Sequence, residues 1–386
     1  MRASLRMKKS QVLKIGLVVD DTLDKPDGVQ QYVLLVGAWL SAQGHEVHYL
    51  VGQSSRTDLP NVHSLAKNVP VTFNKNKLTV PLPANKRRIQ QLLEQEKFDI
   101  LHVQMPYSPL LAGRIVKLAP ATTAIVGTFH ILPFSRTEQI ATRFLGTILR
   151  SSLRKFSEVI AVSEPARIFA KDAFAVNAQV LPNVVDLAWY KRRVPIQARP
   201  KSPVTIVFLG RLVERKGSLQ LLRAVAALKL DTRQKLRVII GGKGPLLPEL
   251  TSFVSANNLA DIVEFAGFVT EEDKPAFLHQ AHIAAFPATG GESFGIVLLE
   301  AMAAGSGVVI GGNNPGYSSV LSEWPDVLID PNDTAAFAQT LQGFIENEQS
   351  RQSVFASQQA AVDMYDVQVV GPQLVKLYQK SIAKPV

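Results

Sequence analysis

The sequence predicts an α/β protein with two domains, each built on a parallel β-sheet that helices cover on both faces. Short apolar segments alternate with helical segments along the chain, which is typical of buried parallel strands. The alternation stops once, in residues 181–203, and then starts again. The length of 386 residues also exceeds what one hydrophobic core usually organises.

The first domain is expected to span residues 1–184. After its first strand, a polar turn leads into the helical stretch VQQYVLLVGAWLSAQGH. Further helical or loop segments separate the later strands. The predicted strands are KIGLVV (14–19), EVHYLVG (46–52), FDILHVQ (98–104), TAIVGTFH (123–130) and EVIAVS (158–163).

The interruption contains clustered basic residues and prolines without periodicity, and we interpret residues 185–203 as an interdomain linker. The second domain then spans residues 204–369. The helical segment 370–386 could pack back on the first domain or stay on the second. The predicted strands of the second domain are VTIVFLG (204–210), RVIIGG (237–242), IVEFAG (262–267), HIAAFP (282–287) and GVVIGG (307–312), with helices through SLQLLRAVAAL and around Glu300.

Composition limits the classes of protein to consider. Cysteine is absent, which excludes disulfides and thiolate metal sites and fits a reducing compartment. The basic start of the chain precedes an apolar segment too short for a signal peptide. No apolar stretch approaches the roughly 20 residues of a membrane span. We therefore expect a cytoplasmic protein that is soluble or at most peripheral to a membrane.

The net charge of +10 is unevenly distributed. Residues 1–184 contain 23 Lys and Arg against 13 Asp and Glu, whereas residues 185–386 contain 19 of each kind. The first domain should therefore meet an anionic partner, either nucleic acid or an acidic membrane surface. The chain lacks the basic motifs interleaved with aromatic residues that single-strand binders use, which disfavours nucleic acid.

Two loops of the second domain indicate an anion site. Arg211, Arg215 and Lys216 in FLGRLVERKG fall where a strand gives way to a helix. Doubly wound sheets bind ligands at that edge, and cations beside a helix N-terminus suit a diphosphate. A solvated basic loop is the alternative. Gly242 in IIGGKGP allows close backbone approach, but the spacing is not that of a Walker A loop, so a P-loop ATPase or GTPase is not expected.

The segment GGESFGIVLLEAMAAG adds two acids to this region. Its glycines precede a helix whose first amides have no partner within the helix and favour an anion. Glu292 lies just before these donors, and Glu300 lies inside an apolar run where an ionised carboxylate needs a partner. Sugar hydroxyls could satisfy both acids; an exposed position for Glu300 is the alternative. The expected donor-binding segment is Ser293, Phe294, Gly295, Ile296 and Val297.

These motifs, together with LPNVVD, resemble the retaining glycosyltransferases of family four, and the nearest type is the phosphatidylinositol mannosyltransferases. The resemblance covers nearly the whole chain. It implies the GT-B architecture, in which two Rossmann-like domains face an interdomain cleft. It further implies that the second domain holds a nucleotide sugar and the first an acceptor, with no metal or other cofactor.

The resemblance also implies roles for individual residues. Arg211 and Lys216 would clamp the diphosphate, and Glu214 would support them. Glu292 would hold the hydroxyls of the donor sugar, and Glu300 those of the ribose.

The first domain would contribute a glycine loop and a histidine. Gly28 matches the loop that approaches the phosphates, although Asp27 replaces the second glycine usual in this family. His130, at the end of a strand, would face the donor sugar; a structural histidine is the alternative.

The resemblance favours mannose transfer from GDP-mannose to a hydroxyl of a lipid headgroup such as phosphatidylinositol. Glu271, in the loop after IVEFAGFV, could accept hydrogen bonds from guanine. UDP-glucose or UDP-N-acetylglucosamine, with another lipid or saccharide acceptor, is an alternative. A sugar-nucleotide-binding protein without catalysis is an alternative from a different class.

Residues 136–155 of the first domain are expected to form a basic amphipathic helix. Ile140, Phe144, Ile148 and Leu149 follow helical spacing and could rest in a membrane interface or face the core. Cations on another face, together with a second basic cluster, favour an anionic lipid surface at the inner face of the cell membrane. The cations in question are Arg136, Arg143, Arg150 and Arg154, with Lys86, Arg87 and Arg88 in the second cluster.

Overall fold

The structure is a computed structural model. It describes residues 12–24, 27–73, 76–82, 84–133, 136–195 and 199–383, with the backbone alone for residues 70–73, 76–81, 136, 137 and 139. The basic start of the chain, residues 196–198 of the predicted linker, residues 384–386 of the C-terminal segment and the side chain of Arg136 lie outside the described part.

A seven-stranded sheet organises the first half of the chain, and all its neighbouring strands are parallel. The strand order is β3-β2-β1-β6-β7-β8-β9, so the order reverses between β1 and β6. All the strands predicted for the first half are confirmed. The strands are β1 (Lys14–Val19), β2 (Glu46–Val51), β3 (Val62–Ser64), β6 (Ile100–Gln104), β7 (Ala124–Phe129), β8 (Glu158–Ala161) and β9 (Gln179–Val180).

A six-stranded parallel sheet organises the second half, with the order β12-β11-β10-β13-β14-β15. Here the reversal falls between β10 and β13. Doubly wound sheets bind ligands outside the carboxyl ends of the strands at such a reversal. The strands are β10 (Val204–Leu209), β11 (Leu236–Gly241), β12 (Val263–Gly267), β13 (Ile283–Phe286), β14 (Val308–Gly312) and β15 (Leu328–Ile329).

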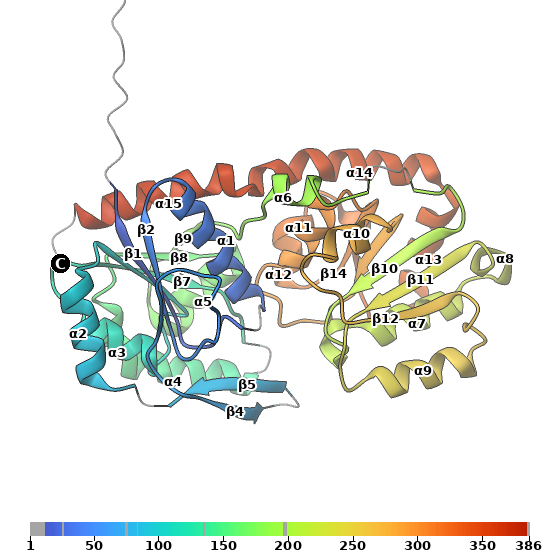
Figure 1. The fold of residues 1–386 in the computed structure, drawn as a ribbon. Coiled ribbons are helices and arrows are strands. Elements are labelled where there is room, and N and C mark those ends of the chain that lie inside the picture. The colour runs from blue at the N-terminus through green and yellow to red at the C-terminus, as the bar shows by residue number, and fades with distance from the viewer. Residues whose placement is uncertain are drawn as a thin grey trace, which may run out of the picture.

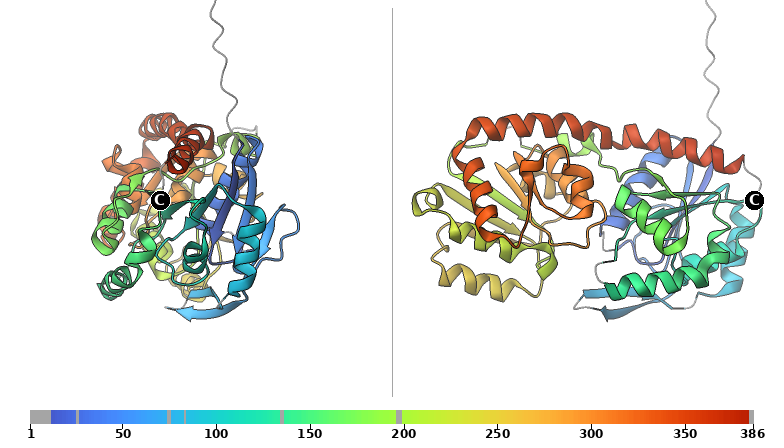
Figure 2. Two further views of the ribbon diagram at one scale, coloured as in Figure 1. Left: turned by 90° about the vertical axis from the view of Figure 1, so that its left-hand side faces the viewer. Right: turned by 180° about the vertical axis from the view of Figure 1, so that it is seen from behind.

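Helices lie on both faces of each sheet (Figures 1 and 2). In the first half they are α1 (Gly28–Ala42), α2 (Lys86–Glu96), α3 (Leu111–Leu118), α4 (Arg136–Leu153), α5 (Glu164–Phe174) and α6 (Leu187–Lys191). In the second half they are α7 (Ser218–Ala227), α8 (Leu230–Arg233), α9 (Leu247–Ala256), α10 (Lys274–His279), α11 (Ile296–Ala303), α12 (Pro315–Leu321), α13 (Thr334–Glu346), α14 (Glu348–Val362) and α15 (Val367–Ile382). The described residues also form the 3₁₀ turns η1 (Glu214–Lys216), η2 (Pro325–Val327) and η3 (Asp363–Tyr365). Among the described residues, no helix combines the length and apolar character needed to cross a membrane.

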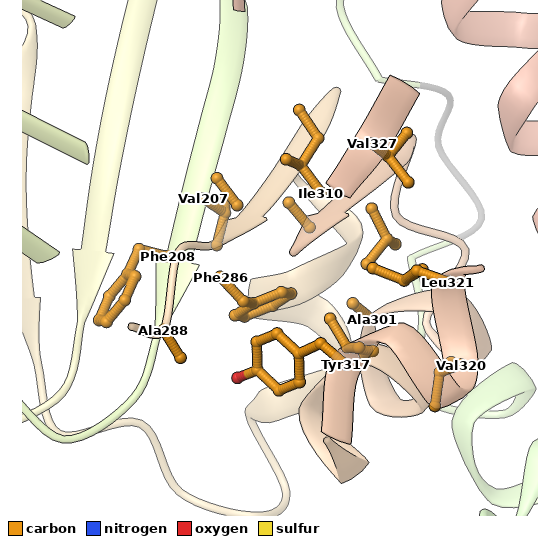
Figure 3. Packing of buried hydrophobic residues seen from close by; sticks show 14 of the residues in the cluster. Val207, Phe208, Phe286, Ala288, Ala301, Ile310, Tyr317, Val320, Leu321 and Val327 are labelled. Atoms are coloured by element: carbon orange, nitrogen blue, oxygen red, sulfur yellow. The ribbon is translucent and has the colours of Figure 1, made fainter. Parts of the chain in front are cut away.

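The core of the second domain packs α11 and α12 against the central strands. Figure 3 shows Phe286 from β13 and Tyr317 from α12 side by side, with Ala301 of α11 beside them. Tyr317 and Phe286 are almost fully buried. Burying an aromatic side chain of this size stabilises a fold by about 1.5–3 kcal/mol. This packing fixes α11, and therefore Glu300, relative to the strands.

The last two long helices link the domains. Figures 1 and 2 show α14 on the second domain and α15 on the first, lined up along one side of the molecule. Nε1 of Trp39 in α1 donates to Oε1 of Gln368 at 3.0 Å, and the hydroxyl of Tyr378 lies 2.7 Å from Nδ1 of His102 in β6. The C-terminal helix therefore packs on the first domain.

The short strands β3, β9 and β15 were not predicted, and neither was a hairpin in the first domain. A two-stranded antiparallel hairpin, β4 (Asn68–Phe73) with β5 (Asn76–Pro81), projects from the first domain (Figure 1).

Candidate active site

Two loops at the strand-order reversal of the second domain bring opposite charges together. Nη1 of Arg215 and Nζ of Lys216, both in η1 after β10, each lie 2.7 Å from Oε1 of Glu292, which follows β13. The main chain joins the same loops, since the amide of Thr289 donates to the carbonyl of Arg215 at 2.9 Å. Gly217 lies at φ +76°, and a Cβ there would come within 1.9 Å of the carbonyl oxygen of Pro287, so only glycine fits.

The N-terminus of α11 opens beside this cluster. Gly295 precedes the helix at φ +99° and turns the chain so that the amides of Ile296 and Val297 head the helix. A Cβ on Gly28, the first residue of α1, would lie 3.7 Å from the side chain of Ile296. The N-termini of one helix from each domain therefore face each other, and both favour an anion between them. The side chain of Phe294 is buried and packs against Tyr365, so only its amide is available.

Glu300 has a protein partner that the sequence interpretation missed. Nζ of Lys274 in α10 lies 2.7 Å from Oε1 of Glu300 and 2.7 Å from Oε2 of Glu271. Glu300 and Lys274 are both buried, and Tyr190 of α6 also bonds to Glu300. Burial alone would lower the pKa of Lys274. The two carboxylates raise this pKa by more than burial lowers it, so the pKa lies above its usual value and the ammonium stays charged.

The first domain contacts this region at three points. Nε2 of Gln31 in α1 donates to Oε1 of Glu271 at 2.8 Å. The hydroxyl of Ser293 donates to the carbonyl of His130, and the hydroxyl of Ser163 donates to the carbonyl of Ser293 at 2.5 Å. The carboxyl edges of the two sheets therefore meet around the segment that precedes α11.

His130 is buried at this contact. Its Nε2 lies 2.6 Å from Oε1 of Gln104, and its ring packs edge-on against Tyr32 with centroids 5.0 Å apart. Burial lowers the pKa of His130 to about 3, so the imidazole is neutral near pH 7. A neutral ring can orient a hydroxyl but has no charge to contribute there.

The remaining predicted donor residues lie around the same loops. Gly242 follows β11 at φ +133°, and a Cβ there would come within 1.8 Å of the carbonyl oxygen of Gly210. The side chains of Arg211 and Glu214 are exposed on the loop after β10. The structure thus brings Lys216 and Glu292 into direct contact and places Arg211 and Glu214 on the same loop as Lys216.

The predicted membrane residues lie elsewhere on the first domain. Lys86, Arg87 and Arg88 form the exposed first turn of α2, and Arg143 is exposed on α4. Arg150 and Arg154, at the end of α4, line a cavity of about 480 Å³ together with the strand start at Glu158.

The buried histidines predict a pH-dependent stability. Burial lowers the pKa of His102, like that of His130, to about 3, whereas an unfolded histidine titrates near 6.5. As the pH falls, the unfolded chain binds these protons before the folded chain does. The stability that comes from the neutral buried histidines is therefore fully present above pH 6.5 and is lost as the pH drops toward 3. Each histidine should lower the free energy of unfolding by about 2 kcal/mol between pH 7 and pH 5.

Chemical denaturation at both pH values checks this, with His102→Gln as the comparison. The variant should lose about 2 kcal/mol less than the wild type over that interval. The other titratable groups, Asp20 among them, are present in both proteins. The difference between the two losses of stability is therefore due to His102. Equal losses in the two proteins would contradict the assignment.

Solved structures with the same architecture identify the fold. HepE from Anabaena, solved in complex with UDP-glucose, has a TM-score of 0.74 at 19% identity, covering 95% of this chain and 99% of that one. A glycosyltransferase from Rickettsia africae has a TM-score of 0.72 at 15% identity, covering 97% of this chain and 99% of that one. These likenesses show the fold, which is the GT-B fold of glycosyltransferases.

Sequence comparison then gives the family. The model described as Glycosyltransferase Family 4 matches residues 26–189, and that described as Glycosyl transferases group 1 matches residues 191–359. The phosphatidyl-myo-inositol mannosyltransferase of Mycolicibacterium smegmatis is 34% identical over 95% of this chain and 94% of its own length. That of Propionibacterium freudenreichii is 31% identical over 95% and 94%. The chain belongs to glycosyltransferase family 4 and is a glycosyltransferase of this retaining family.

Several residues of the site were not among those assigned a role. Arg215 was predicted with Arg211 and Lys216 to face an anion but was not assigned to the diphosphate clamp. Lys274 stands three residues after Glu271, a spacing that lets the two side chains meet. Gln31, Ser163 and Tyr190 reach the site from the first domain and from α6, which no local pattern reveals.

Proposed function

We propose that the protein transfers mannose from GDP-mannose to a hydroxyl of phosphatidylinositol with retention of the anomeric configuration. The observation that carries the proposal is the contact of Arg215, Lys216 and Glu292 beside the N-terminus of α11. Relatives support the substrate. The phosphatidyl-myo-inositol mannosyltransferase of Mycolicibacterium smegmatis matches 95% of this chain. A Mycobacterium tuberculosis relative described as a GDP-mannose-dependent alpha-(1-6)-phosphatidylinositol monomannoside mannosyltransferase is 26% identical and matches 82% of this chain.

The cluster explains how a diphosphate would be held. Without a donor, one carboxylate oxygen of Glu292 accepts from both Arg215 and Lys216. A diphosphate carries more charge than a carboxylate and would replace Glu292 as their partner, with Arg211 on the same loop and the amides that head α11 completing the anion site. Glu292 would then be released to accept hydrogen bonds from hydroxyls of the donor sugar.

The chemical step needs stabilisation mainly at the leaving group. The bond between the sugar C1 and the β-phosphate oxygen breaks, and a bond from the acceptor oxygen to C1 forms on the same face. The departing phosphate oxygen takes the proton of the acceptor hydroxyl. Arg211, Arg215 and Lys216 stabilise the negative charge that develops there, which is the largest contribution of the protein. His130, neutral and buried beside Ser293, helps to orient the sugar.

The base end of the site favours guanine. Guanine presents two adjacent N–H donors, which one carboxylate can accept together. Glu271 is half-exposed and held by Lys274 and Gln31, so its carboxylate is oriented before the donor binds. Glu300, next to it through Lys274, would hold the ribose hydroxyls. Uracil has a single N–H between two carbonyls and would gain less from this carboxylate.

A thermal-shift panel of GDP-mannose, UDP-glucose, UDP-N-acetylglucosamine and ADP-glucose tests the donor. A ligand at 100 times its Kd stabilises the fold by about 2.7 kcal/mol. We expect GDP-mannose to reach this stabilisation at a lower concentration than the other three sugar nucleotides. Glu271→Gln should reduce the thermal shift given by GDP-mannose and leave the smaller shifts given by the UDP and ADP sugars unchanged. Equal shifts for all nucleotides would remove the support for guanine, and a larger UDP-sugar shift would indicate the alternative donor.

An exposed apolar row on α4 supports an acceptor in a membrane. Ile140, Phe144 and Ile148 are 68%, 70% and 60% exposed, whereas Leu149 is buried against the domain. The row therefore does not face the core. Exposed cations flank it on the same helix, and Lys86, Arg87 and Arg88 stand at the N-terminus of α2, where positive charge opposes the helix dipole. We propose that this face rests on anionic lipid at the inner face of the cell membrane.

Replacing Ile140 and Phe144 by serine should weaken binding to vesicles that contain phosphatidylinositol by at least tenfold. Each side chain is expected to contribute about 1.5–3 kcal/mol when it enters the interface. Vesicle co-sedimentation measures the change, and Leu230→Ser, at a 60% exposed apolar residue of the second domain, is the matched control. Equal binding of the wild type and the double variant would show that the row does not enter the lipid.

A further inference from the structure

A second cavity lies at the opposite edge of the second domain from the donor site. Its volume is about 240 Å³, and its lining includes Arg199, His282 and Gly307. His282 and Gly307 immediately precede β13 and β14, and Arg199 lies in the segment that leads into β10, so the cavity lies at the amino ends of these parallel strands. The donor site lies at the carboxyl ends of β10 and β13. The two sites are therefore separated by the length of the sheet.

Positive charge dominates this cavity. Arg199, Lys201 and Arg351 line it, and Glu348 is the one acid among the lining residues. Arg351 is 9% exposed, and its Nη1 donates to the carbonyls of Phe344 and Ile345. Nη1 of Arg199 donates to the carbonyl of Ala281. Within the described part of the chain, neither guanidinium forms an ion pair.

Arg351 is buried without an ion pair among the described residues, whereas Arg199 is half-buried and Lys201 is exposed. A buried cation is unfavourable unless something compensates its charge. The carboxylate of Glu348 is already bonded to Nε2 of Gln352 at 3.0 Å. Arg351 belongs to the first turn of α14, but its guanidinium reaches the last carbonyls of α13, which favour a cation without neutralising its charge. Burial lowers the pKa of both arginines, and the charge of Glu348 offsets this only in part at Arg351.

The other walls set the kind of ligand. Nδ1 of His282 accepts from the amide of Thr205 at 2.9 Å, and its ring also bonds to the main chain of Pro200, so the imidazole is held as a neutral wall. The guanidinium of Arg199 lies 5.8 Å from the centre of the Phe355 ring, which forms an apolar side. The volume is below the roughly 300–1,000 Å³ of pockets for drug-sized ligands.

We propose that this cavity binds a small phosphate-bearing anion, either inorganic phosphate or a compact phosphomonoester, between Arg199, Lys201 and Arg351. The two arginine forks and the lysine suit a phosphoryl group. Because Arg199 and Lys201 belong to the end of the predicted linker, which leads into β10, the bound anion ties this segment to α14. The site is independent of the proposed transfer reaction.

Isothermal titration of inorganic phosphate, and in parallel of glycerol phosphate, into the GDP-saturated protein tests the proposal. Constant ionic strength in chloride keeps general screening equal, and GDP occupies the donor site. We expect saturable binding with one anion per chain. The double variant Arg199→Gln/Lys201→Gln should bind at least tenfold more weakly, and Lys201→Gln alone several-fold more weakly. Lys229→Gln/Lys235→Gln, which removes two exposed lysines of the same domain, should bind like the wild type.

The variants can be compared whether or not GDP binds. The test of the anion cavity can therefore fail while the proposed function holds, and the reverse. Lys201 is exposed, so Lys201→Gln should leave the fold intact. If the double variant with Arg199→Gln does not fold, Lys201→Gln alone still tests the site. Absence of binding by the wild type, or equal affinity in all four proteins, would overturn the proposal. Binding only to vesicles of phosphatidic acid, and to neither soluble anion, would also overturn it, since the site would then be part of a lipid surface.

Discussion

Replacing Lys216 by methionine should lower kcat for sugar transfer by about 10²–10³, the typical effect of removing one preorganised group that stabilises a developing anion. Its ammonium lies 2.7 Å from Glu292 and stands where the proposed diphosphate would bind. Methionine keeps the length and apolar stem of the side chain, so the loop should retain its packing. Glu292 keeps Arg215 as a partner in the variant, which limits the loss of stability.

Steady-state kinetics with the preferred sugar nucleotide measures this effect. Lys229→Met is the control, because Lys229 is an exposed lysine of the same domain, and it should retain the wild-type kcat. Donor affinity should fall together with kcat, because the ground state and the transition state both carry the diphosphate charge. A kcat within threefold of the wild type would exclude Lys216 from the leaving-group site.

Replacing Lys274 by methionine should destabilise the protein by about 3–5 kcal/mol, the usual effect of removing one member of a buried ion pair. Its ammonium is the cation between Glu300 and Glu271, and both Lys274 and Glu300 are buried. Glu300 would keep its bond to Tyr190 but would carry an uncompensated charge. Chemical denaturation at pH 7 measures the change in the free energy of unfolding.

The double variant Lys274→Met/Glu300→Gln separates charge from packing. Neutralising Glu300 removes the unpaired charge, so the double variant should be more stable than Lys274→Met alone. Donor binding should weaken in both variants, since both alter the proposed ribose and base contacts. If Lys274→Met lost less than 1 kcal/mol, or if Glu300→Gln gave no recovery, the pair would not be the element that fixes the base end of the site.

The predicted strands and the helix around Glu300 are confirmed because they depend on local signals, namely short apolar runs and a glycine-bounded apolar helix. The two-domain α/β fold follows from the same alternation. The β4–β5 hairpin was not predicted because its strands are short and contain Pro70 and Pro81, which weaken a strand pattern. Sheet order is not encoded locally, and the strand-order reversals became visible only in the structure.

The candidate site also contains some features that local sequence signals predict and others that only the fold reveals. The proximity of Lys216 to Glu292 was anticipated from motifs that follow two strands. The partner of Glu300 was not, because Lys274 lies 26 residues away and reaches it through the packing of α10 on α11. The apolar spacing on α4 allowed a core face or a surface face. Only the packing of Leu149 against the domain, with Phe144 and Ile148 left exposed, distinguishes the two.

The most direct test of the central claim is the anomeric configuration of the product. Purified protein would be incubated with GDP-mannose and vesicles containing phosphatidylinositol, and the isolated lipid examined by NMR. We expect one mannose per inositol in the α configuration of the donor, with one GDP released for each mannose transferred. A β-linked product, or no transfer to lipid while the donor binds and stays intact, would contradict the claim.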